Sequence, residues 1–156
     1  MNTNKLDFIQ HGFVQLVKDL PAAKMGNWGK MNAQQMLEHV KAFFKVSSGK
    51  LHFDLVTAEE QLPKYKTFLL SDKEFRENTQ APTSVIGEEA LLLQHADMQD
   101  AVMALQQSID EFVGYFKEDE NKQTLHPVFG QLNFEEWVLL HYKHLLHHAK
   151  QFGLAV

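Results

Sequence analysis

The stretch LLLQHADMQDAVMALQQSIDEFVGYF, residues 91–116, carries the longest periodic pattern in the chain. One histidine and seven apolar residues recur in it at alternating spacings of four and three: Leu91, His95, Met98, Val102, Leu105, Ile109, Phe112 and Phe116. This spacing places them along one face of an α-helix. The pattern therefore predicts a helix of about seven turns that faces a hydrophobic core.

Two earlier segments show the same helical period. Apolar residues in 6–20 repeat at three and four before Pro21 interrupts the pattern, which predicts a first helix there. A second helix is expected over about 32–48, because Asn32 and Gln35 have the spacing of a capping box.

A last helix is expected near the end of the sequence, over about 133–152. Asn133 and Glu136 form a second capping-box pattern at its start, and Gly153 follows its end. Four long helices are therefore expected in all.

Residues 51–87 lack a sustained period and contain Pro63, Pro82 and Gly87. We expect a long crossover there, with one short helix near residues 59–70. The predicted fold is all-α, a four-helix bundle with a long crossover between its second and third helices. A single domain is expected to span residues 1–156.

The composition narrows the classes of partner. The chain has 156 residues and no cysteine, so disulfides and thiolate ligands are absent and imidazole and carboxylate are the strong metal ligands left. A formal charge of −5 argues against nucleic acid as a partner. No apolar run approaches the roughly 18 residues that cross a bilayer, and no leader is evident. We therefore expect a cytoplasmic protein whose partners are small molecules or proteins, with no membrane contact.

Four of the nine histidines fall within eight positions of the last predicted helix: His141, His144, His147 and His148. His144 and His148 are one helical turn apart on the apolar face that also carries Trp137, so their imidazoles can reach one ion. On the helical wheel His141 shares this face, whereas His147 falls beside Lys143 on the polar side.

A third imidazole is expected from the second helix. His39 lies between Met36, Val40 and Phe43 at helical spacing, so it faces the same core. Several buried imidazoles are unfavourable unless each has a partner, and a divalent metal satisfies them together. The sequence thus predicts metal ligation by His39, His144 and His148; the alternative is that each is a hydrogen-bonded core residue.

The other candidate residues have weaker patterns. His141 is a candidate general base, a residue that supports the ligands, or an alternative ligand. His95 on the third helix and His126 at a turn remain open as members of the site. Glu38 and Gln151 neighbour the ligands in sequence and are candidates for hydrogen bonds to them.

Two segments resemble a known superfamily. WGKMNAQQMLEHV, residues 28–40, and HPVFGQLNFEEWVLLHYKHLLHHAKQFG, residues 126–153, are similar to the DinB-like metal-binding four-helix bundles, closest to a functionally uncharacterised branch. The pattern HxxHHxxQ from His144 to Gln151 is the most specific element. The resemblance implies zinc or nickel bound by His39, His144 and His148. The arginine and glycine that usually follow the paired histidines are replaced here by Ala149 and Lys150.

Three function classes follow. Three neutral ligands leave coordination positions open, which is typical of a catalytic metal. The resemblance implies a transferase or isomerase that uses a low-molecular-weight thiol. The alternatives are a metal or small-ligand binding module without turnover, and a structural helical protein that forms a homodimer through Leu139 and Leu146.

Overall fold

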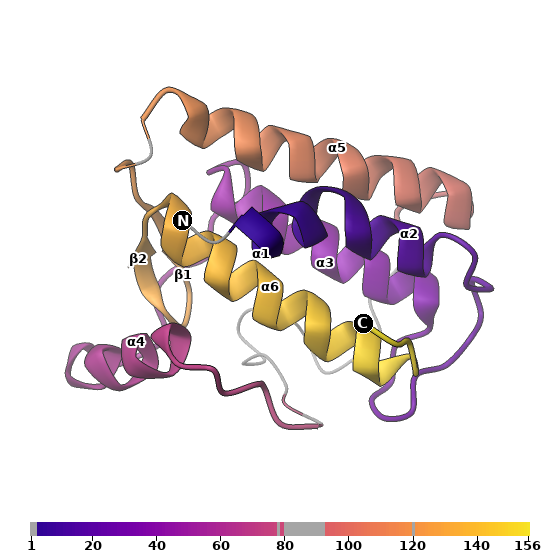
Figure 1. Ribbon diagram of the computed structural model, residues 1–156, viewed down its shortest axis with the longest axis horizontal. Helices are drawn as coiled ribbons and strands as arrows, with labels where there is room; N and C mark the ends of the chain where they lie inside the picture. Colours follow the sequence, from indigo (N-terminus) through magenta and orange to yellow (C-terminus); the bar gives the residue numbers. More distant parts are fainter. Residues whose placement is uncertain (1–2, 78, 80–92, 120) are drawn as a thin grey trace.

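Long helices make up most of the chain in the computed structural model, which describes residues 3–77, 79, 93–119 and 121–156. The first helical stretch consists of α1 (Thr3–Asp7), the π-helical turn η1 (Phe8–Gly12) and α2 (Phe13–Val17), which follow one another without a break. The other long helices are α3 (Ala33–Ser47), α5 (Met98–Lys117) and α6 (Phe134–Gln151) (Figure 1).

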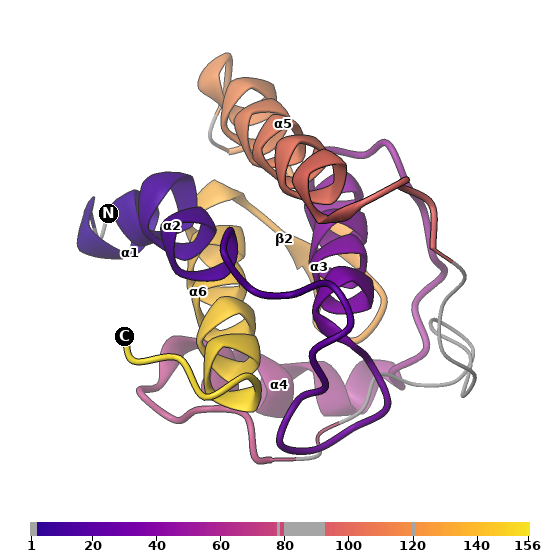
Figure 2. The ribbon, with the colours of Figure 1, turned by 90° about the vertical axis from the view of Figure 1, so that its right-hand side faces the viewer.

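These helices lie side by side around a shared apolar core. Figure 2, which looks along them, shows α3 and α5 on one side and α2 and α6 on the other. Packing of α3 on α5, and of α6 on α3 and on the first stretch, agrees with this arrangement. The core is rich in large side chains that are fully buried, among them Phe13, Phe44, Phe112, Phe116 and Trp137. None of the helices in the described residues is long and apolar enough to cross a membrane.

Both predicted capping boxes are present. Asn32 accepts a hydrogen bond from the backbone N–H of Gln35, and the Gln35 side chain accepts one from the backbone of Asn32. Asn133 and Glu136 do the same at the start of α6. Each pair satisfies backbone donors that the helix itself leaves free, which typically stabilises a helix start by about 1 kcal/mol. The starts of α3 and α6 therefore confirm the sequence prediction.

The short helix of the crossover is also confirmed. A 3₁₀ turn, η2 (Glu59–Gln61), leads into α4 (Leu62–Leu70), which has Pro63 in its first turn. Proline fits there because its missing N–H would have no partner inside the helix. Figure 1 shows α4 below the hairpin, on the side where α6 begins, and α4 contacts α6. The later part of the crossover, with Pro82 and Gly87, lies outside the described residues.

The helix predicted over 91–116 starts later than expected. α5 begins at Met98, because the side chain of Asp97 accepts a hydrogen bond from the N–H of Asp100 and so forms the N-cap. Leu91 lies outside the described residues, and the placement of His95 on the helix was wrong, since it precedes the cap. The first helical stretch likewise ends at Val17 rather than Leu20.

A β-hairpin adds a small sheet to a chain that is otherwise helical, so the expectation of an all-α fold holds in part. β1 (Thr124–His126) pairs antiparallel with β2 (Gly130–Leu132), with Thr124 opposite Leu132 and His126 opposite Gly130. The turn between them was expected, but three-residue strands are too short to show a period of two. The chain is therefore mostly helical with one small two-stranded sheet among the described residues.

Candidate metal centre

Three imidazoles from two helices meet at one point in the core. His39 comes from α3, and His144 and His148 come from successive turns of α6. One ring nitrogen of each lies within 4.8 Å of the others. The Nε2 atom of His144 lies 3.0 Å from Nε2 of His39 and 2.9 Å from Nε2 of His148. The predicted convergence of these residues is therefore present, and the set is close enough to hold a metal ion.

Burial keeps these imidazoles neutral. His39 and His148 are buried, and His144 is half-buried. Burial, assisted by the charge of nearby His147, lowers the pKa of His39 to about 4. Burial and the surrounding imidazoles also hold the pKa of His144 well below its usual range. Neutral imidazole is the form that binds metal, so no proton has to leave at neutral pH.

Gln151 fixes which nitrogen of His148 carries the proton. The side-chain N–H of Gln151 donates to the carbonyl of Trp28 at 2.9 Å, and a carbonyl can only accept. The amide oxygen of Gln151 therefore faces Nδ1 of His148, 2.7 Å away, and Nδ1 must donate to it. The Nε2 atom of His148 is left with a free lone pair that points toward His144.

The chemistry of the three nitrogens fits a cation better than hydrogen bonds. Because Nε2 of His148 has no proton, it can only accept a hydrogen bond from His144. That bond uses the one proton that Nε2 of His144 can carry. That single proton cannot also form a linear hydrogen bond to His39. Nδ1 of His39 is buried without a hydrogen-bond partner among the described residues, so no hydrogen bond there fixes the proton of this ring as Gln151 does for His148. A divalent ion would accept all three lone pairs at once.

The loop before α3 is built around Gln151. The backbone N–H of Asn27 donates to the carbonyl of Gln151 at 2.6 Å. A Cβ atom added to Gly26 would lie 2.7 Å from Cγ of Gln151, and one added to Gly29 would lie 2.8 Å from its Nε2. Gly29 also has a φ of +81°, which favours glycine. These glycines let the loop close on the amide that orients His148.

Nearly the whole chain matches one protein family. A family model described as "Protein of unknown function (DUF1569)" matches residues 13–154, nearly the whole chain. The chain belongs to the DUF1569 family. No curated protein and no solved structure matches it. The DUF1569 match covers all three clustered histidines and supplies no activity for them.

His141 does not join the cluster in this DUF1569 chain. Its ring stacks on Phe44, with centroids 3.9 Å apart, and on Trp137 at 5.2 Å. The Ser47 hydroxyl donates to the carbonyl of Phe44, so its oxygen accepts from Nε2 of His141, 3.0 Å away. His141 thus links α6 to α3 within the core through its hydrogen bond to Ser47, and its candidate role as a general base stays a prediction.

His147 departs from its expected polar surroundings. It is buried between Trp28 and Phe75, with ring centroids 5.6 and 5.9 Å away. Lys143, on the same side of α6, is also buried and donates to the carbonyls of Ser71 and Lys73. The helical wheel of α6 could not show this, because segments distant in sequence cover that side.

His126 closes the turn of the hairpin. Its Nδ1 accepts hydrogen bonds from the backbone N–H groups of Val128 and Phe129, at 3.0 and 3.2 Å. Its ring packs against Phe43, 5.6 Å away, whose own ring contacts His144. His126 therefore supports the wall of the cluster and is not one of the three converging imidazoles.

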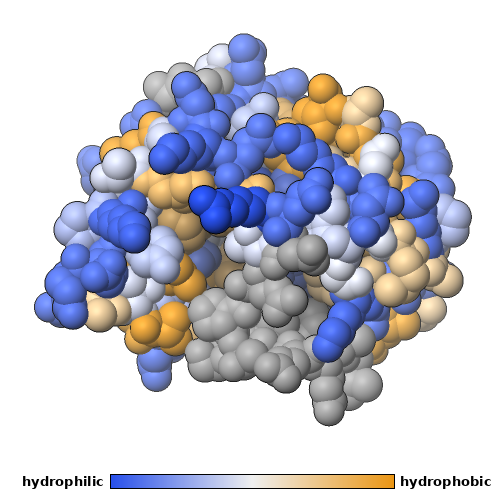
Figure 3. All heavy atoms as spheres, turned by 90° about the horizontal axis from the view of Figure 1, so that it is seen from below, coloured by the Kyte–Doolittle hydropathy of each residue, from blue (hydrophilic) through white to orange (hydrophobic). Residues whose placement is uncertain are grey.

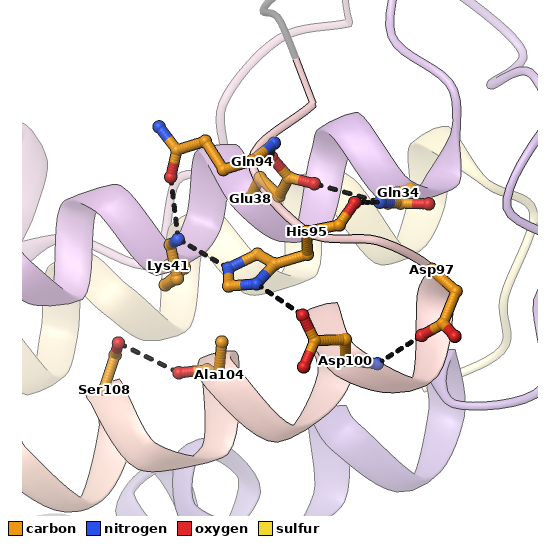
Figure 4. A network of polar contacts seen from close by, with 9 residues as sticks. All are labelled: Gln34, Glu38, Lys41, Gln94, His95, Asp97, Asp100, Ala104 and Ser108. Atoms are coloured by element: carbon orange, nitrogen blue, oxygen red, sulfur yellow. Dashed lines mark hydrogen bonds and ion pairs between the residues drawn. The ribbon is translucent and has the colours of Figure 1, made fainter.

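His95 belongs to a separate polar network on the other side of α3 (Figure 4). The Lys41 ammonium donates to Nε2 of His95 at 2.8 Å, so Nδ1 carries the proton and donates to Asp100 at 2.9 Å. The buried carboxylate of Glu38 accepts from the backbone N–H of Gln94. Glu38 therefore holds the segment before α5 and does not support the metal ligands, whereas the expectation for Gln151 is confirmed.

The first prediction concerns Gln151. Replacing it with leucine removes the acceptor that orients His148 and leaves the Trp28 carbonyl without its donor, so affinity for Zn²⁺ should fall about 10- to 100-fold. Isothermal titration calorimetry with Zn²⁺ measures the change. Gln131→Leu is the control, because Gln131 is the exposed residue of β2. Unchanged affinity in Gln151→Leu would show that this amide does not position His148.

Proposed function

We propose that this DUF1569 protein binds one divalent ion, zinc or nickel, through His39, His144 and His148. The observation that carries the proposal is the convergence of three neutral Nε2 atoms, one of them with its lone pair fixed by Gln151. The arrangement of the long helices in Figure 2 also supports a DinB-like four-helix bundle with an added hairpin.

We further propose that the site is catalytic and that its substrate includes a low-molecular-weight thiol. When bound, a divalent ion lowers the pKa of a coordinated water or thiol and so supplies a nucleophile at neutral pH. Three protein ligands leave room for such a group. We propose a thiol as the substrate because of the resemblance to DinB-like proteins.

The residues around the cluster have defined tasks in this proposal. Gln151 keeps the proton on Nδ1 of His148, so that Nε2 stays available. The ring of Phe43 lies edge-on to both His39 and His144, with ring centroids 5.3 and 5.4 Å away, and so helps to hold the two imidazoles in place.

The second prediction tests the proposal directly. Protein purified without a histidine tag and reconstituted with Zn²⁺ or Ni²⁺ should hold about one ion per chain by elemental analysis. The loaded protein, and not the metal-free protein, should then consume thiol in a screen of cellular thiols and small electrophiles. A metal content near zero would overturn the site. Bound metal without turnover would leave the alternative of a binding module.

The structural homodimer has less support. Leu139 and Leu146, which were expected to form its contact, are only half exposed, and Leu139 packs against the core. The first helical stretch packs against α6 as well. Most of the helix surface that such a dimer would use is thus occupied within the chain.

A further inference from the structure

A pocket of about 640 Å³ lies between α4 and the segment that follows it, outside the histidine cluster. Its volume is in the range of small-molecule sites. Four aromatic residues line it: Tyr65, Phe68, Phe75 and Phe129. The rings pack on one another, with centroids 5.3 Å apart for Phe68 and Phe75 and 5.6 Å apart for Tyr65 and Phe129. The wall is therefore an aromatic surface that suits a flat apolar group.

Three positively charged side chains form a rim around this aromatic wall. Lys64, Lys73 and Arg76 line the pocket, and none of their side chains makes an ion pair within the described part of the chain. The pocket has one acidic residue, Glu74, and this carboxylate is already paired with Lys150. The residues that line the pocket therefore carry more positive than negative charge, although the chain as a whole has a formal charge of −5. Such a rim favours an anion.

The pocket is held in shape by α6. The buried ammonium of Lys143 donates to the carbonyls of Ser71 and Lys73 and lies over the ring of Phe68, 5.0 Å from its centroid. Lys66 of α4 pairs with Glu136 of α6. These ties fix both sides of the pocket before any ligand binds, which lowers the entropic cost of binding. Figure 3 views the molecule from the side on which α4 lies, and shows small hydrophobic patches among hydrophilic residues.

We propose that this pocket binds a small organic anion with a flat apolar body, such as an aromatic carboxylate or sulfonate. The rings hold the body, and Lys64, Lys73 and Arg76 attract the charged group. Phe75 contacts His147, whose ring contacts His148, so a single ring separates the wall of the pocket from the histidine cluster on this side. The binding itself requires no metal and goes beyond the proposed function.

The test uses two fluorescent probes with similar rings and different charge. 1-Anilinonaphthalene-8-sulfonate is an anion, and N-phenyl-1-naphthylamine is neutral. In metal-free protein, Lys64→Gln/Lys73→Gln/Arg76→Gln should weaken binding of the sulfonate about tenfold or more and leave the neutral probe nearly unchanged. Phe75→Leu should weaken both probes, because it removes part of the aromatic wall.

The control carries the same change in net charge at three exposed sites away from the pocket, in Lys18→Gln/Lys24→Gln/Lys117→Gln. This variant should bind both probes as the unaltered protein does. Equal weakening by the control, or no effect of the pocket variant, would overturn the proposal. Repeating the titration in His144→Ala separates this result from the fate of the metal site, because probe binding should persist there.

Discussion

Alanine at His144 or His148 should reduce affinity for Zn²⁺ about 100-fold or more, the largest effect expected of any single substitution in the chain. Each change removes one of the three proposed ligands, whose Nε2 atoms lie together. His39→Ala should have the same consequence, because it is the single contribution from α3. Competition titration with a chromogenic chelator at neutral pH measures the loss.

His147→Ala is the matched control, since it alters a buried imidazole on the same helix. His147 contacts the ring of His148 but contributes no atom to the converging set. We expect it to lose stability and to retain about one ion per chain. Strong metal loss in His147→Ala with retention in His148→Ala would show that the ligands are assigned to the wrong side of α6.

Acid should destabilise the metal-free fold steeply between about pH 6.5 and pH 4. Burial lowers the pKa of His39 to about 4 and that of His126 to about 3. The unfolded chain takes up protons near the ordinary histidine value, while the folded chain still excludes them. Stability is therefore complete above about pH 6.5 and is lost as pH falls toward the folded values; His39 alone contributes on the order of 3 kcal/mol.

Urea unfolding at several pH values, followed by tryptophan fluorescence, measures this dependence. His126→Asn keeps an acceptor for the turn but removes one titrating group, so its stability should depend less on pH. His52→Gln alters an exposed histidine and should leave the dependence unchanged. Equal pH dependence in His126→Asn and the unaltered protein would contradict the effect of burial. The same shifts imply that metal affinity is retained to lower pH than the value of about 6.5 for free imidazole suggests.

The histidine cluster was predictable because the position of each imidazole on its helix follows from the residue spacing within that helix. Capping residues set the starts of α3 and α6, and a spacing of four brings His144 and His148 to one side of α6. Helical periodicity does not show which side chains of a helix are buried by segments that are distant in sequence. The surroundings of His147 depend on Trp28 and Phe75, which lie far from it in sequence.

His95 illustrates the opposite limit. It matches the apolar period of α5, yet the helix begins only after Asp97. The carboxylate of Asp97 accepts a hydrogen bond from the N–H of Asp100 and so caps the helix two residues beyond His95. The strands of the hairpin were missed because pairing depends on a partner strand, which three residues do not reveal. The pairing of Gln151 with His148 was only suggested by their nearness in sequence.

Thr124 has a consequence for how metal would be exchanged. Its hydroxyl donates to the carbonyl of Ser47 at the end of α3 and accepts from the indole of Trp137 on α6. The two helices that carry the histidines are thereby joined by the hairpin, at a point independent of the histidines themselves. In zinc fingers the ion holds the chain together, and chelation unfolds it. Here Thr124 joins the two helices through hydrogen bonds that need no ion, so a chelator should leave the chain folded, and a proposed ion of one kind should be replaceable by another according to supply.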